Sequence, residues 1–347
     1  MTEEPAAGSA AMRKSKVLIT DHSWPSVAPE QRILEEAGAT VVVARSGEQS
    51  ELLRLAPDVD AILTCFATVS GEMIRAAKHL KIIGRYGIGV DNIDVATATQ
   101  QDVLVTNVPA YCLDEVAEHV LALLLTMARN LRSYDTAIRA SDWSLTAGRP
   151  LFRVRGQTLG IVGFGKIGRT VAQKVAGLSL RVLAYDPVMD GAAIRAEGAV
   201  PVPLQQLMAD SDFVTLHVPL NGDTKHLINA ELLGLMKPSA FLINASRGAI
   251  VDKEALIDAL NGGRLAGAAL DVFEPEKPAV DDSLWKARNL LATPHVAFYS
   301  EESVLELEIK AAQNVIAVLH GRRPESVVNP EVLDRPRWKG LTPKEQV

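Results

Sequence analysis

The sequence has few cysteines, no excess of positive charge and no long apolar run, and each absence excludes a class of protein. Cys65 and Cys112 cannot form a disulfide framework or a paired-cysteine metal site, so we expect no metal and a reduced, cytoplasmic setting. A formal net charge of −6 disfavours nucleic acid and anionic membranes as partners, because both attract basic surfaces. The longest apolar run, 120–128, is under half of a membrane span.

The chain is long enough, at 347 residues, for two domains. Residues 1–15 begin small and acidic, without the basic start and apolar core of a signal peptide, and we expect them to form a disordered leader. Short β-rich runs then alternate with helical ones, which predicts an α/β fold of parallel sheets covered by helices. The strands expected in the first half are 16–21, 40–45, 60–66, 80–86 and 102–108. The helices expected between them are 30–39, 50–56 and 71–80.

A second alternation follows a long helix expected over 113–131, which is too apolar for a one-sided amphipathic helix and suits a domain or subunit contact. Six further strands predict a doubly wound dinucleotide-binding fold, and they fall at 159–162, 180–185, 213–218, 240–244, 266–272 and 290–292. Helices are expected at 167–176, 204–208, 230–236 and 253–260, with a last helix at 301–319. The apolar segment 327–330 can then return to the first domain.

A glycine motif stands at the start of the second alternation. The segment 158–168 reads T-L-G-I-V-G-F-G-K-I-G, a short apolar run followed by G-x-G-x-x-G and a helical stretch. In this strand-turn-helix context the motif predicts a dinucleotide site. Gly163 allows a tight turn, Gly165 lets backbone N–H groups approach a pyrophosphate, and Gly168 lets the helix pack on its strand. The helix N-terminus directs partial positive charge at the phosphates.

Asp186 ends the next expected strand, 18 residues beyond Gly168. A carboxylate near this offset accepts hydrogen bonds from the adenosine ribose hydroxyls and repels a 2′-phosphate, which favours NAD over NADP. The alternative is that Asp186 only starts a turn before Pro187. With the glycine motif upstream, we favour the cofactor role.

Charged groups and a histidine follow three later strands. Arg247 lies in N-A-S-R-G, where a guanidinium can bind a carboxylate through two parallel hydrogen bonds. Glu276 lies in D-V-F-E-P-E and His295 in T-P-H, both after strands. Ligands of open α/β sheets bind at the carboxyl ends of strands, so these groups can face one crevice. A carboxylate beside a histidine favours the imidazolium, which suits proton donation. Spacing alone does not separate Glu276 from Glu274 in this role.

The motifs G-F-G-K-I-G, Y-D-P, N-A-S-R-G, D-V-F-E-P-E and T-P-H together resemble the D-isomer-specific 2-hydroxyacid dehydrogenase family, over nearly the whole chain. In that family the arginine of N-A-S-R-G binds the substrate carboxylate and carbonyl. The third residue after D-V-F is the catalytic glutamate, and the histidine after T-P is the acid/base. The resemblance therefore assigns these roles to Arg247, Glu276 and His295, and it selects Glu276 over Glu274.

The resemblance also implies NAD as the cofactor and a set of residues that bind it. These lie in the glycine turn and near the ends of later strands: Gly163, Gly165, Lys166, Ile167, Gly168, Asp186, His217, Pro219, Thr224, Ala245, Ser246, Arg247, Asp271 and His295.

Two doubly wound domains and a dimer follow from the same resemblance. A flavodoxin-like substrate domain is expected over 16–108 plus 300–334, a Rossmann NAD-binding domain over 109–299, and a polar tail over 335–347. The region 114–143 is expected to form the contact of a homodimer. The residues expected to bind a small 2-oxo or 2-hydroxy acid are Arg85, Gly87, Ile88, Gly89 and Phe298.

Two branches of the family are the most similar. T-P-H-V-A-F-Y-S-E-E resembles the branch that contains the C-terminal-binding-protein corepressors, and the phosphoglycerate dehydrogenases are similar along the motifs. Segment 62–69 lacks the basic residues that the phosphoglycerate branch places there for a phosphate, which disfavours phosphoglycerate as the substrate. We expect reversible hydride transfer between NAD(H) and a small 2-oxo acid. The alternative is an NAD-sensing binding protein, related to the corepressors, with vestigial activity.

Overall fold

The computed structural model describes residues 13–342 and divides the chain into two compact units. The first domain comprises Met1–Tyr111 and Val304–Val347, and the second comprises Cys112–Ser303. Most of the expected leader, 1–12, and the end of the expected tail, 343–347, lie outside the described residues. Both domains are α/β with parallel sheets, which confirms the predicted fold class.

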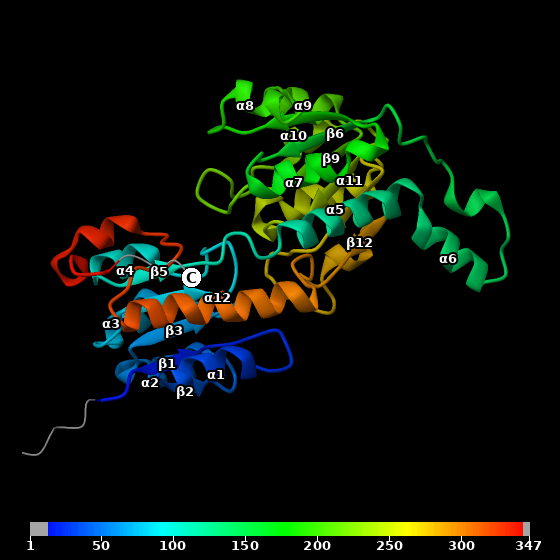
Figure 1. The fold of residues 1–347 in the computed structure, drawn as a ribbon. Helices are drawn as coiled ribbons and strands as arrows, with labels where there is room; N and C mark the ends of the chain where they lie inside the picture. Colours follow the sequence, from blue (N-terminus) through cyan, green and yellow to red (C-terminus); the bar gives the residue numbers. More distant parts are fainter. Residues whose placement is uncertain (1–12, 343–347) are drawn as a thin grey trace, which may run out of the picture. The chain divides into compact units, whose positions relative to one another are not determined.

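The first domain has a five-stranded parallel sheet in the order β2-β1-β3-β4-β5, which is the flavodoxin-like order (Figure 1). Its strands are β1 Lys16–Ile19, β2 Thr40–Val43, β3 Ala61–Thr64, β4 Ile82–Arg85 and β5 Leu104–Thr106. Its helices are α1 Ala28–Glu36, α2 Gln49–Leu55, α3 Gly71–Ala76 and α4 Val95–Gln100, with most of α12, Glu301–Leu319. Every residue of β3 and β4 is buried, as expected for parallel strands covered on both faces.

The C-terminal segment lies along the free edge of this sheet. The Val105 N–H donates to Asn329 Oδ1 at 2.8 Å, and the Val328 N–H donates to the Val105 carbonyl at 2.8 Å. Residues 335–342, which the sequence presents as the start of a polar tail, also pack here. Trp338 is 6% exposed, and its indole N–H donates to the Asp102 carbonyl at 2.9 Å.

Two carboxylates are buried together in the first domain. Glu30 on α1 is fully buried and Glu308 on α12 is 3% exposed. The two carboxylates lie within hydrogen-bonding reach of each other, and the Tyr86 hydroxyl donates to Glu30 Oε1 at 3.1 Å. Burial, followed by the charge of Glu30, raises the pKa of Glu308 to about 8. Burial also raises the pKa of Glu30, although hydrogen bonds and the nearby His22 oppose it. We therefore expect a proton shared between the two carboxylates to hold α12 against α1.

This pair predicts a specific pH dependence of stability. Because the pKa of Glu308 rises on folding from 4.5 to about 8, its stabilising contribution is complete below 4.5 and is lost as the pH rises through about 8. The loss is at most about 1.4 kcal/mol per pH unit. We expect Glu308→Gln to flatten the decline in the free energy of unfolding, measured by urea denaturation at about pH 5.5 and about pH 8.5. Glu302→Gln, exposed on the same helix, is the control. Equal destabilisation by Glu308→Gln at both pH values would contradict a shared proton.

The second domain has a seven-stranded parallel sheet in the order β12-β11-β10-β9-β6-β7-β8 (Figure 1). Its strands are β6 Thr158–Val162, β7 Arg181–Tyr185, β8 Val200–Pro201, β9 Phe213–Leu216, β10 Phe241–Asn244, β11 Gly267–Leu270 and β12 Leu290–Ala292. The prediction of six strands was wrong. The extra strand, β8, has only two residues and ends in a proline, so no β-rich run marks it in the sequence.

Helices cover both faces of this sheet, because alternate strand residues enter two separate cores. One core contains residues of α9 Leu204–Asp210, α10 Ala230–Leu235 and α11 Lys253–Asn261. The other contains residues of α5 Leu113–Ala128, α7 Lys166–Lys174 and α8 Gly191–Ala196. Short 3₁₀ helices occur in the two domains at Ala56–Asp58, Leu145–Gly148, Ala176–Leu178, Gly248–Ile250, Ser283–Lys286, Pro330–Asp334 and Pro336–Trp338.

The single helix expected over 113–131 is broken in the structure. Asn130 adopts a left-handed backbone conformation with φ 48°, which ends the first helix, and α6, Leu131–Arg139, starts in a new direction. The Asn130 amide donates to the Gly148 carbonyl at 3.1 Å, and its Oδ1 accepts from Ser133 Oγ at 2.9 Å. Figure 1 shows α6 projecting from the rest of the second domain. Among residues 13–342, no helix combines the length and apolarity needed to cross a membrane.

Candidate active site

The carboxyl ends of the central strands of the second domain carry most of the expected site residues. The sheet is parallel, so these ends lie along one edge. β6 pairs with β7 on one side and with β9 on the other, where Leu159–Val162 lie opposite Phe213–Leu216. The chain runs outward from β6 in one direction and returns to continue from β9 in the other. This reversal is the position at which open α/β sheets bind ligands.

The glycine turn has the three properties that a dinucleotide site requires. Gly163 has φ 91°, and a Cβ there would lie 2.6 Å from the His217 backbone. A Cβ on Gly168 would lie 2.3 Å from the Gly163 carbonyl oxygen, so only glycine lets α7 start this close to the turn. A Cβ on Gly165 would meet nothing within 4 Å, so this glycine faces open space at the N-terminus of α7. A pyrophosphate fits this space, because the first-turn N–H groups of a helix favour an anion.

Asp186 follows β7 directly and joins this strand end to the glycine turn. Its Oδ2 accepts the Phe164 N–H at 2.8 Å, and its Oδ1 accepts the N–H groups of Val188 and Met189, each at 2.9 Å. Burial raises the pKa of Asp186, but these three donors outweigh it and the pKa lies below its ordinary value. Asp186 therefore starts a turn, as the alternative reading proposed, and it also carries the fixed negative charge that the NAD role requires.

Further expected cofactor residues follow β9 and β10. Burial lowers the pKa of His217 to about 4, so this imidazole is neutral, and it lies 3.0 Å from Thr215 Oγ1. Thr224 Oγ1 donates to the Pro219 carbonyl at 2.6 Å. Ser246 Oγ donates to the Val218 carbonyl at 2.7 Å, which ties the loop after β10 to the loop after β9. Ala245 is half-buried and follows the last residue of β10 directly.

Arg247 is positioned by a buried amide that the sequence analysis did not single out. Asn244, 1% exposed, donates from Nδ2 to the Arg247 carbonyl at 2.8 Å and accepts the Ser246 N–H on Oδ1 at 3.0 Å. The guanidinium Nη1 donates to the Ser246 carbonyl at 2.8 Å. One side chain thus sets the conformation of the loop that carries the arginine. The signal was present in N-A-S-R-G, but the role of its first residue depends on the folded loop.

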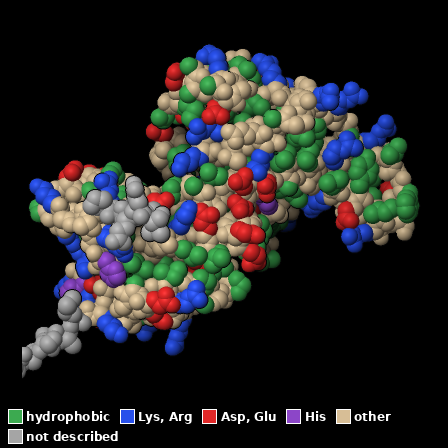
Figure 2. Space-filling view, in the orientation of Figure 1, with side chains coloured by type: hydrophobic (Ala, Val, Ile, Leu, Met, Phe, Trp, Pro, Cys, Tyr) green, Lys and Arg blue, Asp and Glu red, His purple; other side chains and the backbone are tan. Residues whose placement is uncertain are grey.

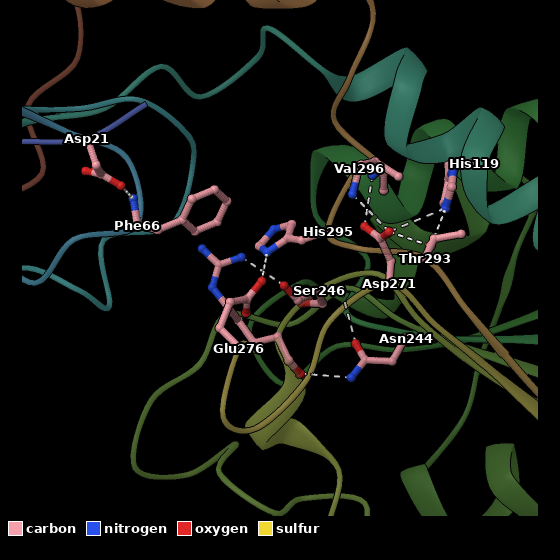
Figure 3. Close-up of polar contacts among 12 residues, drawn as sticks. Asp21, Phe66, His119, Asn244, Ser246, Asp271, Glu276, Thr293, His295 and Val296 are labelled. Atoms are coloured by element: carbon pink, nitrogen blue, oxygen red, sulfur yellow. Dashed lines mark hydrogen bonds and ion pairs between the residues drawn. The ribbon is translucent and has the colours of Figure 1, made fainter. Parts of the chain in front are cut away.

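His295 and Glu276 are hydrogen-bonded through His295 Nδ1 and Glu276 Oε1 (Figure 3). The competing carboxylate has other partners, because Glu274 accepts from His226 Nε2 at 2.8 Å and pairs with Lys225 at 3.7 Å. Geometry therefore joins Glu276, and not Glu274, to His295. The imidazole of His295 also lies 6.2 Å, centroid to centroid, from the ring of Phe298.

Asp271, expected to bind the cofactor, lies at the carboxyl end of β11 and is fully buried. Its carboxylate accepts the N–H groups of Val296 at 3.0 Å and Ala297 at 2.9 Å, and the Thr293 hydroxyl at 2.5 Å (Figure 3). The residue thus organises the turn that follows β12. His119 on α5 and Thr293 complete this group, and neither was singled out in the sequence, where His119 only interrupts an apolar helix.

The expected substrate loop lies in the first domain, at the carboxyl end of β4. Arg85 is 6% exposed, donates from Nε to Asn92 Oδ1 at 3.2 Å, and lies with its guanidinium carbon 5.8 Å from the centroid of the Phe66 ring. Gly87 has φ 147°, and a Cβ there would lie 2.7 Å from Arg85 Nη1. The Ile88 carbonyl accepts from Asn107 at 2.7 Å. The Val108 N–H also donates to the Gly87 carbonyl at 3.0 Å. Gly87 and Ile88 are therefore held by residues 107–108, and the role of 87–89 in binding a substrate stays a prediction.

The chain is similar to dehydrogenases of 2-hydroxy acids. Residues 121–297 match the family described as D-isomer specific 2-hydroxyacid dehydrogenase, NAD binding domain. Glyoxylate reductase from Thermococcus litoralis is 40% identical over 81% of this chain and 87% of its own length. D-3-phosphoglycerate dehydrogenase from Synechocystis is 38% identical over 93% of this chain and 58% of its own length. The crystal structure of D-lactate dehydrogenase from Aquifex aeolicus, complexed with NAD and lactic acid, superposes with a TM-score of 0.81 at 27% identity, over 92% and 97% of the two chains.

The chain belongs to the D-isomer-specific 2-hydroxyacid dehydrogenase family. It is an NAD-dependent oxidoreductase, and its second domain contains the NAD-binding domain of the family. Similarity to phosphoglycerate dehydrogenases agrees with one of the two branches that the motifs indicated. The particular likeness to the corepressor branch stays a prediction.

The glycine turn supplies a test of the cofactor site. We expect Gly168→Ala to weaken NADH binding on the order of 10-fold, or about 1.4 kcal/mol, because the new Cβ must displace α7 from the Gly163 carbonyl. Gly234→Ala in α10 is the matched control, since a Cβ there meets nothing within 4 Å. Fluorescence titration with NADH measures both variants, and thermal unfolding checks that they fold. An unchanged affinity of Gly168→Ala would show that the close approach of α7 is not needed.

Proposed function

We propose that this enzyme interconverts a small, unphosphorylated 2-oxo acid, of the size of glyoxylate, and the corresponding D-2-hydroxy acid with NAD(H). The observation that carries the proposal is the hydrogen-bonded pair of His295 and Glu276 at the sheet edge that also carries the glycine turn and Arg247. The glyoxylate reductase and phosphoglycerate dehydrogenase among its relatives support the reaction class.

The preference for an unphosphorylated acid rests on the segment after β3. The N–H groups of Cys65, Phe66 and Ala67 all donate to the Asp21 carboxylate, at 2.9, 2.6 and 3.0 Å. Such a group of N–H donors is a natural anion site, but here a side chain of the protein already fills it. No lysine or arginine occurs in 62–69, and the negative charge of Asp21 would repel a phosphate. A phosphorylated substrate is therefore disfavoured at this segment.

In the proposed mechanism, Arg247 binds the substrate carboxylate and polarises the carbonyl oxygen. NADH, when bound, supplies the hydride that reduces the C2 carbon. His295 donates a proton to the carbonyl oxygen during reduction and accepts it during oxidation. Because Nδ1 is hydrogen-bonded to Glu276, the transferred proton is the one on Nε2. Glu276 fixes the orientation of the ring and stabilises the imidazolium. One hydride and one proton thus convert the 2-oxo acid to the 2-hydroxy acid.

The experiment that tests this function measures NADH oxidation with a panel of 2-oxo acids. We expect turnover with glyoxylate or another short acid and little with a phosphorylated one. His295→Ala should lower kcat by about 10²- to 10⁴-fold, the usual contribution of a general acid, while NADH binding stays unchanged. Strong NADH binding without turnover on any acid would overturn the proposal and favour an NAD-sensing binding protein.

A matched pair of variants isolates the role of the carboxylate. Glu276→Gln should lower kcat, because a neutral amide stabilises the imidazolium less than a carboxylate does. Glu274→Gln, two residues away, keeps the hydrogen bond to His295 intact and should retain most of the activity, since Glu274 contacts His226 and Lys225 instead. The reverse order of effects would assign the role to Glu274.

We also propose a homodimer through the region 114–143 and a cytoplasmic location. The projecting part of the second domain exposes large apolar side chains, which Figure 2 shows as green patches. Within 114–143 they are Leu131 at 53%, Ile138 at 40% and Trp143 at 85% exposure, and Leu145 at 80% and Phe152 at 53% follow this range in the sequence. Apolar patches of this kind mark protein contacts. The cytoplasmic location rests on the two buried cysteines, neither of which forms a disulfide.

If the proposed dimer forms, substitution of the exposed apolar side chains should change the molecular mass of the protein in solution. We expect Trp143→Ser combined with Leu145→Ser to produce a monomer, because it removes the two most exposed apolar side chains of the projecting region. Val280→Ser, 99% exposed elsewhere in the same domain, should leave the dimer intact. Size-exclusion chromatography with light scattering measures the mass of each. A wild-type monomer, or a dimer that survives the double substitution, would exclude this contact.

A further inference from the structure

A chain of hydrogen bonds lies beneath the turn that carries His295, and the proposed reaction leaves two of its members without a role. His119 on α5 has its Nε2 3.0 Å from Thr293 Oγ1 and 3.6 Å from Asp271 Oδ1. Thr293 Oγ1 donates to Asp271 Oδ1 at 2.5 Å. Figure 3 shows the three side chains joined in this order. This series of hydrogen bonds therefore connects a helix on one face of the sheet to the carboxyl end of β11.

The direction of each hydrogen bond follows from the number of protons available. The buried carboxylate of Asp271 accepts three hydrogen bonds, two of them from backbone N–H groups, so it acts as an acceptor throughout. Thr293 has one hydroxyl proton and gives it to this carboxylate. The oxygen of Thr293 can then only accept from His119, which requires a proton on His119 Nε2. Each group thus orients the next, from His119 through Thr293 to Asp271.

Asp271 in turn fixes the backbone on both sides of the catalytic candidate. Its carbonyl accepts the His295 N–H at 2.7 Å, while its carboxylate accepts the next two N–H groups, those of Val296 and Ala297. His295 has φ 53°, a left-handed conformation that residues other than glycine adopt at an energetic cost. The surrounding hydrogen bonds hold it there, and the same conformation places its imidazole against Glu276.

We propose that His119 and Thr293 are positioning residues of this dehydrogenase. They orient the Asp271 carboxylate, and Asp271 holds 295–297 so that His295 remains paired with Glu276. The two side chains need not touch substrate or cofactor. Asp271 is set apart from the test because its expected cofactor contact would confound any variant. The inference rests on the proposed role of His295 as the acid/base.

Two substitutions each remove one hydrogen bond of the His119–Thr293–Asp271 series, and two conservative substitutions keep these hydrogen bonds. Thr293→Val keeps the shape but removes the hydroxyl, whereas Thr293→Ser keeps the hydroxyl. His119→Phe removes the N–H donor, whereas His119→Gln keeps one on a side chain of similar reach. We expect Thr293→Val and His119→Phe to lower kcat by about 10- to 100-fold, because small displacements of a reacting group are costly. The KM for the 2-oxo acid and the Kd for NADH should change little. Thr293→Ser and His119→Gln should retain most of the wild-type kcat.

The double variant His119→Phe with Thr293→Val should have a kcat no lower than that of the more damaging single variant, since both substitutions disrupt the same series of hydrogen bonds. Thr40→Val and His79→Phe, at exposed positions of the first domain, control for the substitutions themselves. Thermal unfolding must show all variants folded at the assay temperature. A loss of stability with unchanged kcat would reduce the two residues to a structural role and overturn the inference.

Hydrogen–deuterium exchange gives a readout that does not depend on activity. We expect Thr293→Val and His119→Phe to accelerate exchange of the amides at 295–297 without changing the rest of the second domain. Unchanged exchange and unchanged kcat would overturn the inference alone, provided that His295→Ala is inactive. If His295→Ala retains turnover, the proposed function fails instead, and faster exchange at 295–297 would still support the positioning of the turn.

Discussion

The parallel direction of every strand in the second domain is the constraint on which the site depends. It brings residues that are far apart in sequence, from Gly163 to His295, to one edge of one sheet. The strands end earlier than their apolar runs suggest: β9 ends at Leu216 and β11 at Leu270, so His217 and Asp271 are the first residues beyond them. The first residues after each strand are therefore the ones that can turn toward a ligand.

These strand ends must be held, and polar side chains beside them hold them. Asp186 binds the glycine turn, Asn244 binds the loop of Arg247, and Asp271 binds the turn of His295. In the first domain, Asp21 does the same for 65–67. In every case a side chain at the end of one strand satisfies N–H groups or a carbonyl that no ladder satisfies. A strained residue such as His295 can persist only in a loop that is over-determined in this way.

The difference between local patterns and contacts that form only on folding explains what the sequence could predict. Apolar runs and the glycine spacing are local, so the α/β class, most strands and the glycine turn were predictable. Asn130 could not be identified as the break between α5 and α6, because its left-handed conformation depends on hydrogen bonds to Gly148 and Ser133. Local spacing likewise left Glu274 and Glu276 equivalent. Only the folded structure shows that Glu274 is hydrogen-bonded to His226, and the family resemblance had already favoured Glu276.

The charges of the site also depend on local groups. A chain with a net charge of −6 must attract an anionic cofactor and an anionic substrate through local groups. We propose that the N-terminus of α7 and Arg247 supply that attraction. The carboxylates of Asp186 and Asp271 are directed at backbone N–H groups that offset their charge. Asp186 is the informative case, because its three donors lower its pKa and keep it ionised. In the proposed site a cofactor that carries a 2′-phosphate would meet this fixed charge, so we expect the same hydrogen bonds that hold the glycine turn to favour NAD.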